Sequence, residues 1–570
     1  MANDQRAVPF SESSVLRGVH GGISADALPN GYISRGANIQ VRGGFIQTRP
    51  RFRSLGTHAL NSGAFRGAGT LSLNSGDYII FSVGTSVYEF NPADGAVTFL
   101  RDFPTDTGPH FFVQASHFIV VQNGVDAPII YERGVGARSA EADELPPGYM
   151  MAYAHGRIYL VPAEVSDGKG GVVEGRPYWV AGDIALPLDP SNVLKMTETS
   201  YWNEGGATGL PFEAGFISAL AVLHNAQTST DLGALLAFGR GGVSAYQVNA
   251  SREDWKNLDF SQVLFTGEGA TSQRAVTPVS TDVFFRAASG VRSVQLSAAG
   301  DRGWAVKAIS YEVDHRLSLD GDADLSEAWS SFANNRYLLT TAGRDDVSWN
   351  GVISLDTLVA STLTSGNSAP AYDDLWLGNP IFAVCACRIA YRPQHVLLFR
   401  RGDTIDFSVL DDTLQDDYGD RPVTSRFYTR AYTSRDTSMR IDLQHVDVVF
   451  RDIRGALAPK VYYRTDFYSR WTPCSGTPEV ENQTRAHLRF SVDATGCRED
   501  GTPPQIGHSV QICVEWTGTA AVERWTLMVN PTPVDAGSVL PCNRAGSTLS
   551  ESLDRVMVPL DDVVDLMETY

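Results

Sequence analysis

Alternating aspartates between residues 320 and 331 form a candidate cation site. Asp320, Asp322 and Asp324 open the segment in the manner of a calcium-binding loop, in which alternate oxygen ligands converge on one hard cation. Leu325 stands at the sixth position, where the tight turn requires glycine, and Ser331 stands at the twelfth, where a bidentate glutamate belongs. These departures favour a solvated turn, and no metal site is predicted.

A second acidic cluster lies between residues 411 and 420. Its five aspartates are followed directly by Arg421 and Pro422. A charge block that also holds glycine and is followed by proline is typical of a solvated linker or a rim loop. The five aspartates are Asp411, Asp412, Asp416, Asp417 and Asp420.

Patterns that would indicate an enzyme are missing from the sequence. The histidines form no His-Glu-x-x-His pair, no paired Cys-x-x-Cys array occurs, and nucleophile-elbow and phosphate-loop patterns are absent. The stretch 297–304 comes near the aspartate box of sialidase-like propellers, but its spacing is wrong. The tripeptide 401–403, Arg-Gly-Asp, is explained by a turn between two strands. We therefore predict no catalytic residue and no cofactor.

Composition excludes several classes of protein. The chain has 65 acidic and 46 basic residues, a net charge of −19, which argues against a broad phosphate-binding face and against an anionic membrane surface. Hydrophobic residues at 43% and charged residues at 19% indicate a compact globular protein. No apolar run approaches the roughly 20 residues of a membrane helix, and the start of the chain lacks a secretory signal. Cys385 and Cys387 alternate in an apolar run, which predicts small core residues.

One unit recurs along the chain: an apolar strand, a short turn with Gly, Asn or Asp, and a second strand. Residues 58–410 are therefore predicted to form a β-propeller of six to eight blades, because strand pairs at a period near 40 to 50 are typical of propeller blades. A set of β-sandwiches is the alternative. The wide interval around 187–215 indicates an insertion or a missed copy. The seven strand pairs are 78–84 with 87–90, 118–124 with 129–131, 157–161 with 178–180, 234–239 with 243–248, 282–285 with 290–294, 336–339 with 352–355, and 395–399 with 404–407.

The remaining segments differ in texture from the repeats. Beyond the acidic cluster, strict alternation at 441–450 and 460–466 indicates strands with one buried face, so residues 411–532 are predicted to form a β-sandwich-like platform domain. Apolar spacing in the tail, residues 533–570, indicates short amphipathic helices. The Gly-rich arm, residues 1–57, is expected to dock on the propeller or the platform. The predicted fold class is thus all-β.

Two stretches resemble the tail nozzle proteins of short-tailed bacteriophages, also called tail tubular protein B or head-completion stabilisation proteins. The segment 38–50, Asn-Ile-Gln-Val-Arg-Gly-Gly-Phe-Ile-Gln-Thr-Arg-Pro, is similar to the family's amino-terminal signature. The segment 282–293 is similar to its strand-turn-strand unit ending in Gly-Val-Arg-Ser. A weaker likeness lies at 463–471. The likeness covers most of the chain as an order of parts.

The resemblance implies a structural virion protein without catalytic residues. Six copies would form a ring in the tail, assembled in the bacterial cytoplasm, below the portal and adaptor and next to tail fibre or spike proteins, and DNA would pass through without specific binding or membrane insertion. A channel that lets DNA slide must not hold phosphates. The five aspartates of 411–420 are accordingly candidates for a channel lining or rim, with a plain surface linker as the alternative.

A carbohydrate- or receptor-binding propeller is the second hypothesis, and a sialidase-like glycosidase is the third. Aromatic side chains stack on sugar faces, and Trp179, Tyr201 and Trp202 are the candidates for that role. Core packing explains a buried aromatic equally well.

Overall fold

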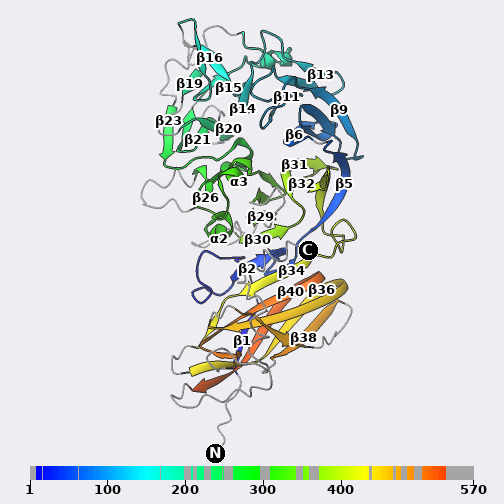
Figure 1. Cartoon of the computed structure of the whole chain (residues 1–570), viewed down its shortest axis with the longest axis vertical. Coiled ribbons are helices and arrows are strands. Elements are labelled where there is room, and N and C mark those ends of the chain that lie inside the picture. Colours follow the sequence, from blue (N-terminus) through cyan, green and yellow to red (C-terminus); the bar gives the residue numbers. More distant parts are fainter. Residues whose placement is uncertain are drawn as a thin grey trace, which may run out of the picture.

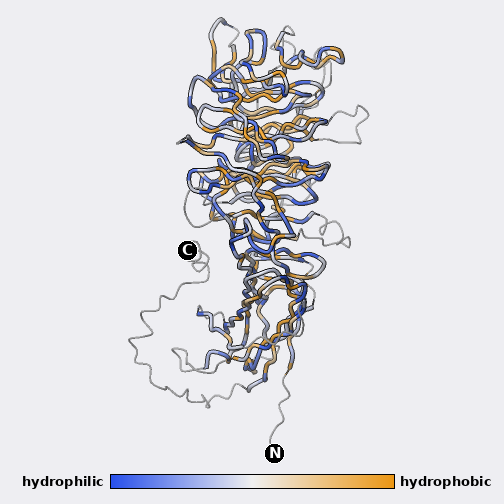
Figure 2. Tube along the Cα trace, turned by 90° about the vertical axis from the view of Figure 1, so that its right-hand side faces the viewer, coloured by the Kyte–Doolittle hydropathy of each residue, from blue (hydrophilic) through white to orange (hydrophobic). Residues whose placement is uncertain are grey.

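The structure is a computed structural model of the whole chain, and it divides into an upper ring of sheets and a lower β domain (Figure 1). Hydrophobic and hydrophilic stretches interleave through both parts (Figure 2). Within the described residues, every helix is too short or too polar to span a bilayer. The structure describes residues 8–533 apart from 14, 16, 62, 167–168, 198–206, 210–214, 224–232, 247, 249–260, 296–307, 342–350, 358–370, 435–438, 467–469, 477–483 and 493–502.

The ring is a seven-bladed β-propeller, within the predicted range of six to eight. All seven predicted strand pairs are present, as the second and third strands of successive blades. The first blade consists of β6(Phe65–Leu73), β7(Gly76–Val83), β8(Ser86–Phe90) and β9(Val97–Asp102), and the second of β10(Phe111–Ala115), β11(Phe118–Gln122), β12(Ile129–Glu132) and β13(Gly136–Ser139). The third blade consists of β14(Gly148–Ala154), β15(Arg157–Pro162), β18(Tyr178–Ala181) and β19(Ala207–Gly209), and the fourth of β20(Ile217–Leu223), β21(Ala234–Gly239), β22(Gly242–Tyr246) and β23(Ser261–Thr266). The last three are β24(Val276–Val279), β25(Asp282–Ala287) and β26(Gly290–Ser293); β27(Ser330–Ala333), β28(Arg336–Thr340), β29(Gly351–Asp356) and β30(Ala371–Leu377); and β31(Ile381–Ile389), β32(Arg392–Arg401), β33(Thr404–Asp411) and β5(Arg51–Ala59).

The ring closes on itself in two ways. The first strands of successive blades contact one another in a complete circuit from β6 through β10, β14, β20, β24, β27 and β31 back to β6. In addition, the amino-terminal strand β5 pairs antiparallel with β33 and supplies the outer strand of the seventh blade. The predicted boundary at residue 57 thus falls inside a strand. Within its described residues, the interval 187–215 contributes η1(Pro190–Leu194) and β19 to the third blade.

Alternation within the strands explains why blades stack. In β7, Ile79 and Phe81 pack toward the seventh blade, whereas Tyr78 and Ile80 pack toward the second. Each neighbouring pair of blades encloses a cluster of this kind. Because both faces of an inner strand are buried, the strand reads as a continuous apolar run. The predicted core position of Cys385 is confirmed, and burial raises the pKa of its thiol to about 12.

Two very long strands organise the second domain. β36(Met439–Thr465) and β40(Ser509–Pro533) pair antiparallel through several register shifts, and Asp452 and Gly455 adopt positive φ angles within two of these shifts. β38(Arg485–Val492) pairs with β36, while β34(Thr424–Thr429) pairs with β40. One hydrophobic core unites these strands. The predicted tail, residues 533–570, begins at the last residue of β40, and its predicted helices lie outside the described residues.

The amino-terminal arm pairs with strands of the second domain and joins this domain to the ring. β1(Val8–Glu12) and β4(Phe45–Thr48) pair with β40, and β4 also pairs with β3(Ile39–Arg42). β2(Ile33–Ala37) lies between β34 and blade strand β30. A hydrogen-bonded path therefore runs from the sixth blade into the second domain.

Two matched glycines test the closure of the ring. Gly95 and Gly134 both have positive φ in the turn before a fourth strand, but a Cβ on Gly95 would lie 2.3 Å from the Leu55 carbonyl oxygen of β5, whereas Gly134 has open space. Alanine costs about 1 kcal/mol at either site through backbone strain. We expect Gly95→Ala to lower the free energy of unfolding by about 2 kcal/mol more than Gly134→Ala does, because of overpacking. Urea unfolding of the two variants measures this difference. Equal losses in the two variants would contradict this closure.

Candidate functional site

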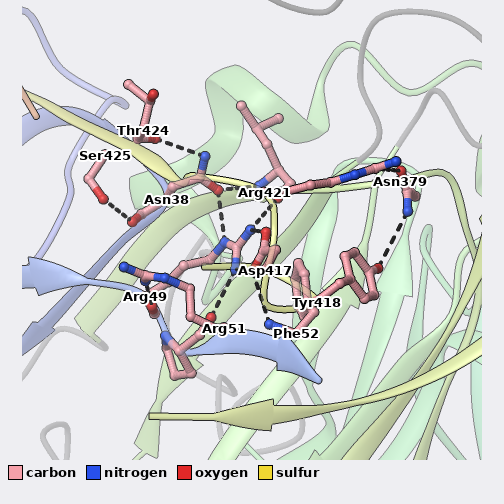
Figure 3. A network of polar contacts seen from close by, with 12 residues as sticks. Asn38, Arg49, Arg51, Phe52, Asn379, Asp417, Tyr418, Arg421, Thr424 and Ser425 are labelled. Atoms are coloured by element: carbon pink, nitrogen blue, oxygen red, sulfur yellow. Dashed lines mark hydrogen bonds and ion pairs between the residues drawn. The ribbon is translucent and has the colours of Figure 1, made fainter. Parts of the chain in front are cut away.

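Asn38 lies at the centre of the joint between ring and second domain. It occupies the turn between β2 and β3 with a φ of 53°, a conformation that asparagine tolerates better than most residues. Its side-chain Oδ1 accepts a hydrogen bond from the Leu377 amide of the sixth blade at 2.8 Å, and its Nδ2 donates to the Thr424 carbonyl of the second domain at 3.0 Å. One amide group thus binds both parts (Figure 3).

Arg49 completes this contact from within the same segment. Its Nε donates to Asn38 Oδ1 at 2.9 Å, and its two terminal nitrogens donate to the two oxygens of Asp417 at 2.9 and 2.6 Å. The arginine side chain is 1% exposed and the aspartate side chain 11%. Asp417 also accepts from the Phe52 amide at 3.0 Å. A bidentate pair of this kind fixes both position and angle.

Arg51 extends the network toward the second domain. Its Nε donates to the Gln415 carbonyl at 2.8 Å, and Nη2 donates to the Thr519 hydroxyl at 2.8 Å. Burial, aided by the neighbouring Arg49, lowers the pKa of Arg51 to about 10. The Arg51 side chain stays charged at neutral pH, so the short segment 49–51 at the start of β5 carries two buried cations into the joint.

Two consecutive aspartates in β30 hold the arm from the other side. Asp373 accepts from the Val41 amide and Asp374 from the Gly36 amide, each at 2.8 Å. Arg336 pairs with Asp373, and Arg316 donates to Asp374 at 3.1 Å. Burial opposes ionisation of both; it raises the pKa of Asp373, whereas Arg316 and His315 outweigh it and lower the pKa of Asp374.

The acidic segment 411–420 is divided by the fold. Asp417 is buried against Arg49, so its assignment to a solvated lining is corrected: the charge is needed to pair a buried guanidinium. Asp411 forms a half-exposed pair with Arg53 at 2.7 Å. Asp412 and Asp420 are exposed, and Asp416 is partly buried. These outer aspartates remain candidates for a rim.

The alternating aspartates at 320–324 serve structure. Asp320 is a fully buried partner of Arg286 in β25 at 3.0 Å, so the expectation of a solvated turn is wrong for this residue. Asp324 accepts from the Gly321 amide at the start of α3(Asp322–Glu327). Among the described residues, no group of three or more side chains is arranged to hold a metal ion.

Trp179 is a core residue and is corrected as a sugar platform. It is fully buried, with ring centroids 5.6 Å from Tyr159 and 5.3 Å from Tyr246. Tyr201, Trp202 and the stretch 297–304 lie outside the described residues.

Comparisons with known proteins add fold likeness only. No family model and no curated protein sequence matches the chain. Among solved structures, one described as BBS1N in complex with ARL6DN is similar at 10% identity, covering 64% of this chain and 99% of that chain with a TM-score of 0.37. A structure of the Mitotic Checkpoint Complex is similar at 10% identity, covering 64% and 96% with a TM-score of 0.36. The blade count rests on the sheet topology described above.

Two aspartates of one segment provide a matched test of the joint. Asp417→Asn leaves Arg49 buried without its counter-ion, and we expect a loss of about 3 to 5 kcal/mol in the free energy of unfolding. Asp411→Asn removes a half-exposed pair, for which the expected loss is below about 1 kcal/mol. Urea unfolding of both variants measures the difference, and a small loss in Asp417→Asn would refute the central role of this ion pair.

Buried His395 predicts a dependence of stability on pH. Its Nε2 lies 3.0 Å from the Arg336 carbonyl, and burial lowers its pKa to about 4 from an ordinary value of 6.5. The unfolded chain therefore takes up a proton first, so this stabilisation is complete above pH 6.5 and is lost as pH falls toward 4. Between pH 7 and pH 4, the free energy of unfolding of His395→Gln, measured by urea unfolding, should fall by about 3 kcal/mol less than that of the parent protein. The control variant is His508→Gln, because His508 is exposed, and a parallel profile for His395→Gln and the parent would contradict the assignment.

Proposed function

We propose that this protein is a structural component of a short-tailed bacteriophage tail. Six copies form a nozzle ring that continues the DNA-ejection channel below the portal and adaptor. The observation that carries the proposal is the position of segment 38–50, the segment on which the family resemblance depends. This segment provides Asn38, Arg49 and the strands β3 and β4 of the joint. A family signature at this place is explained by the need to fix two β domains to each other.

The joint supports a mechanical role. Ring closure by β5 and attachment of the second domain both depend on residues 49–52, which are bound by one buried ion pair. A hydrogen-bonded sheet also runs between the two parts through β30, β2 and β34. A body built in this way resists hinge motion, which suits a subunit that must keep its place in a closed ring.

Charge supports the passage of DNA without retention. The chain carries a net charge of −19, and Asp412 and Asp420 remain exposed beside the joint. Negative surfaces repel phosphates, so DNA slides past without being bound. Adaptor and tail fibre or spike proteins are the proposed neighbours of the ring.

Electron microscopy of the purified full chain tests the proposal directly. We expect rings with sixfold symmetry, alone or after addition of virion tail extract, and a mass six times that of one chain by mass photometry. Asp417→Asn, which disrupts the joint, should reduce ring formation, while Asp411→Asn should leave it unchanged. A chain that stays monomeric with tail extract and instead binds defined sugars on a glycan array would overturn the nozzle proposal.

A further inference from the structure

Three arginine side chains border one pocket beside the joint. The pocket has a volume of about 560 Å³, and its lining includes Arg400 and Arg401 at the end of β32, Arg421 after the acidic segment, and Asn379 before β31. Asp403 is the one carboxylate among the lining residues. Because Arg401 is paired with Asp406, Arg400 and Arg421 against Asp403 leave a local excess of one positive charge in a chain whose net charge is −19.

The surrounding structure holds the guanidinium groups of Arg401 and Arg421 in place and fixes the backbone of Arg400. Arg401 donates to buried Asp406 at 3.0 Å and lies with its Cζ 4.4 Å from the centre of the Tyr418 ring. Arg421 lies over the same ring at 5.9 Å and donates to Asn379 Oδ1 at 3.1 Å. The backbone amide of Arg400 is fixed by the Pro380 carbonyl at 2.6 Å. Preorganised donors lose less conformational entropy when a ligand binds.

The chemistry of the lining selects an oxyanion. A guanidinium offers five N–H donors in a rigid fork that matches a carboxylate, and the hydrogen bond of Arg421 to Asn379 engages one of its nitrogens. Asp403 contributes a second feature, because it repels a ligand of high charge density. The pocket volume lies within the range of small-ligand sites, and is suited to one or two side chains.

We propose that this pocket binds a short acidic segment of a partner protein, with glutamate or aspartate carboxylates seated between Arg400 and Arg421. A nucleic acid is the less favoured ligand, because Asp403 lines the pocket and exposed Asp420 directly precedes Arg421, so successive phosphates would be repelled there. A peptide segment instead places one or two charges in the pocket and can leave it with neutral residues. The inference does not depend on the nozzle assignment.

The test uses the full chain and a fluorescein-labelled peptide, Gly-Ser-Glu-Glu-Ser-Gly, in thermophoresis at low salt. We expect Arg400→Ala combined with Arg421→Ala to weaken binding at least tenfold, and Arg421→Lys to weaken it less. The matched control combines Arg42→Ala with Arg392→Ala, two exposed arginines away from the pocket lining, and should bind as the parent does. Thermal melting checks that every variant is folded.

Three results would overturn the proposal. The first is equal binding by the two double variants, which would make the attraction nonspecific. The second is equal binding of a Gln-Gln peptide, which would exclude carboxylate recognition. The third is tighter binding of a ten-residue oligothymidylate than of the peptide, with the same loss in the pocket variant, which would assign the pocket to nucleic acid. Each result is distinguishable from a failure to form rings, because none depends on assembly.

Discussion

A buried guanidinium needs a counter-ion and hydrogen-bond acceptors, and the arrangement of the whole molecule depends on supplying them to Arg49. Desolvating an ion costs several kcal/mol unless paired geometry offsets it. Arg49 meets the requirement by donating hydrogen bonds to both carboxylate oxygens of Asp417, to the side-chain oxygen of Asn38 and to the Leu377 carbonyl. These partners come from the arm, the sixth blade and the segment that leaves the seventh blade. Satisfying one side chain therefore assembles three distant parts of the chain.

Closure of the propeller and attachment of the second domain are consequences of the same contact. Phe52 follows Arg49 by three residues and gives its amide to Asp417, and from there β5 continues as the outer strand of the seventh blade. On the other side, Asp373 and Asp374 bind amides of the arm from within β30. The ring and the second domain are thus coupled through buried polar groups, which specify one arrangement more narrowly than an apolar interface would.

This coupling gives physical meaning to the proposed role. In a tail ring, each subunit would resist pressure and displacement while DNA passes, and a hinge between its domains would weaken that resistance. The acidic segment reflects the same division of labour within ten residues: Asp417 stabilises the joint, while Asp412 and Asp420 remain exposed. The arginine pocket is lined by residues of the seventh blade and by Arg421, which directly follows this segment.

The sequence by itself determined the blades, because each hairpin depends on local alternation and on turn residues only a few positions apart. It identified all seven strand pairs, and it placed Cys385 in the core. It could not identify β5 as the closing strand, because that pairing joins residues about 350 positions apart in the chain. Nor could it distinguish Asp417 from Asp420, or Asp320 from Asp324, since an aspartate reads as solvated until a distant arginine is placed beside it. Those roles were decided only in the tertiary structure, where burial turns a surface charge into an obligatory ion pair.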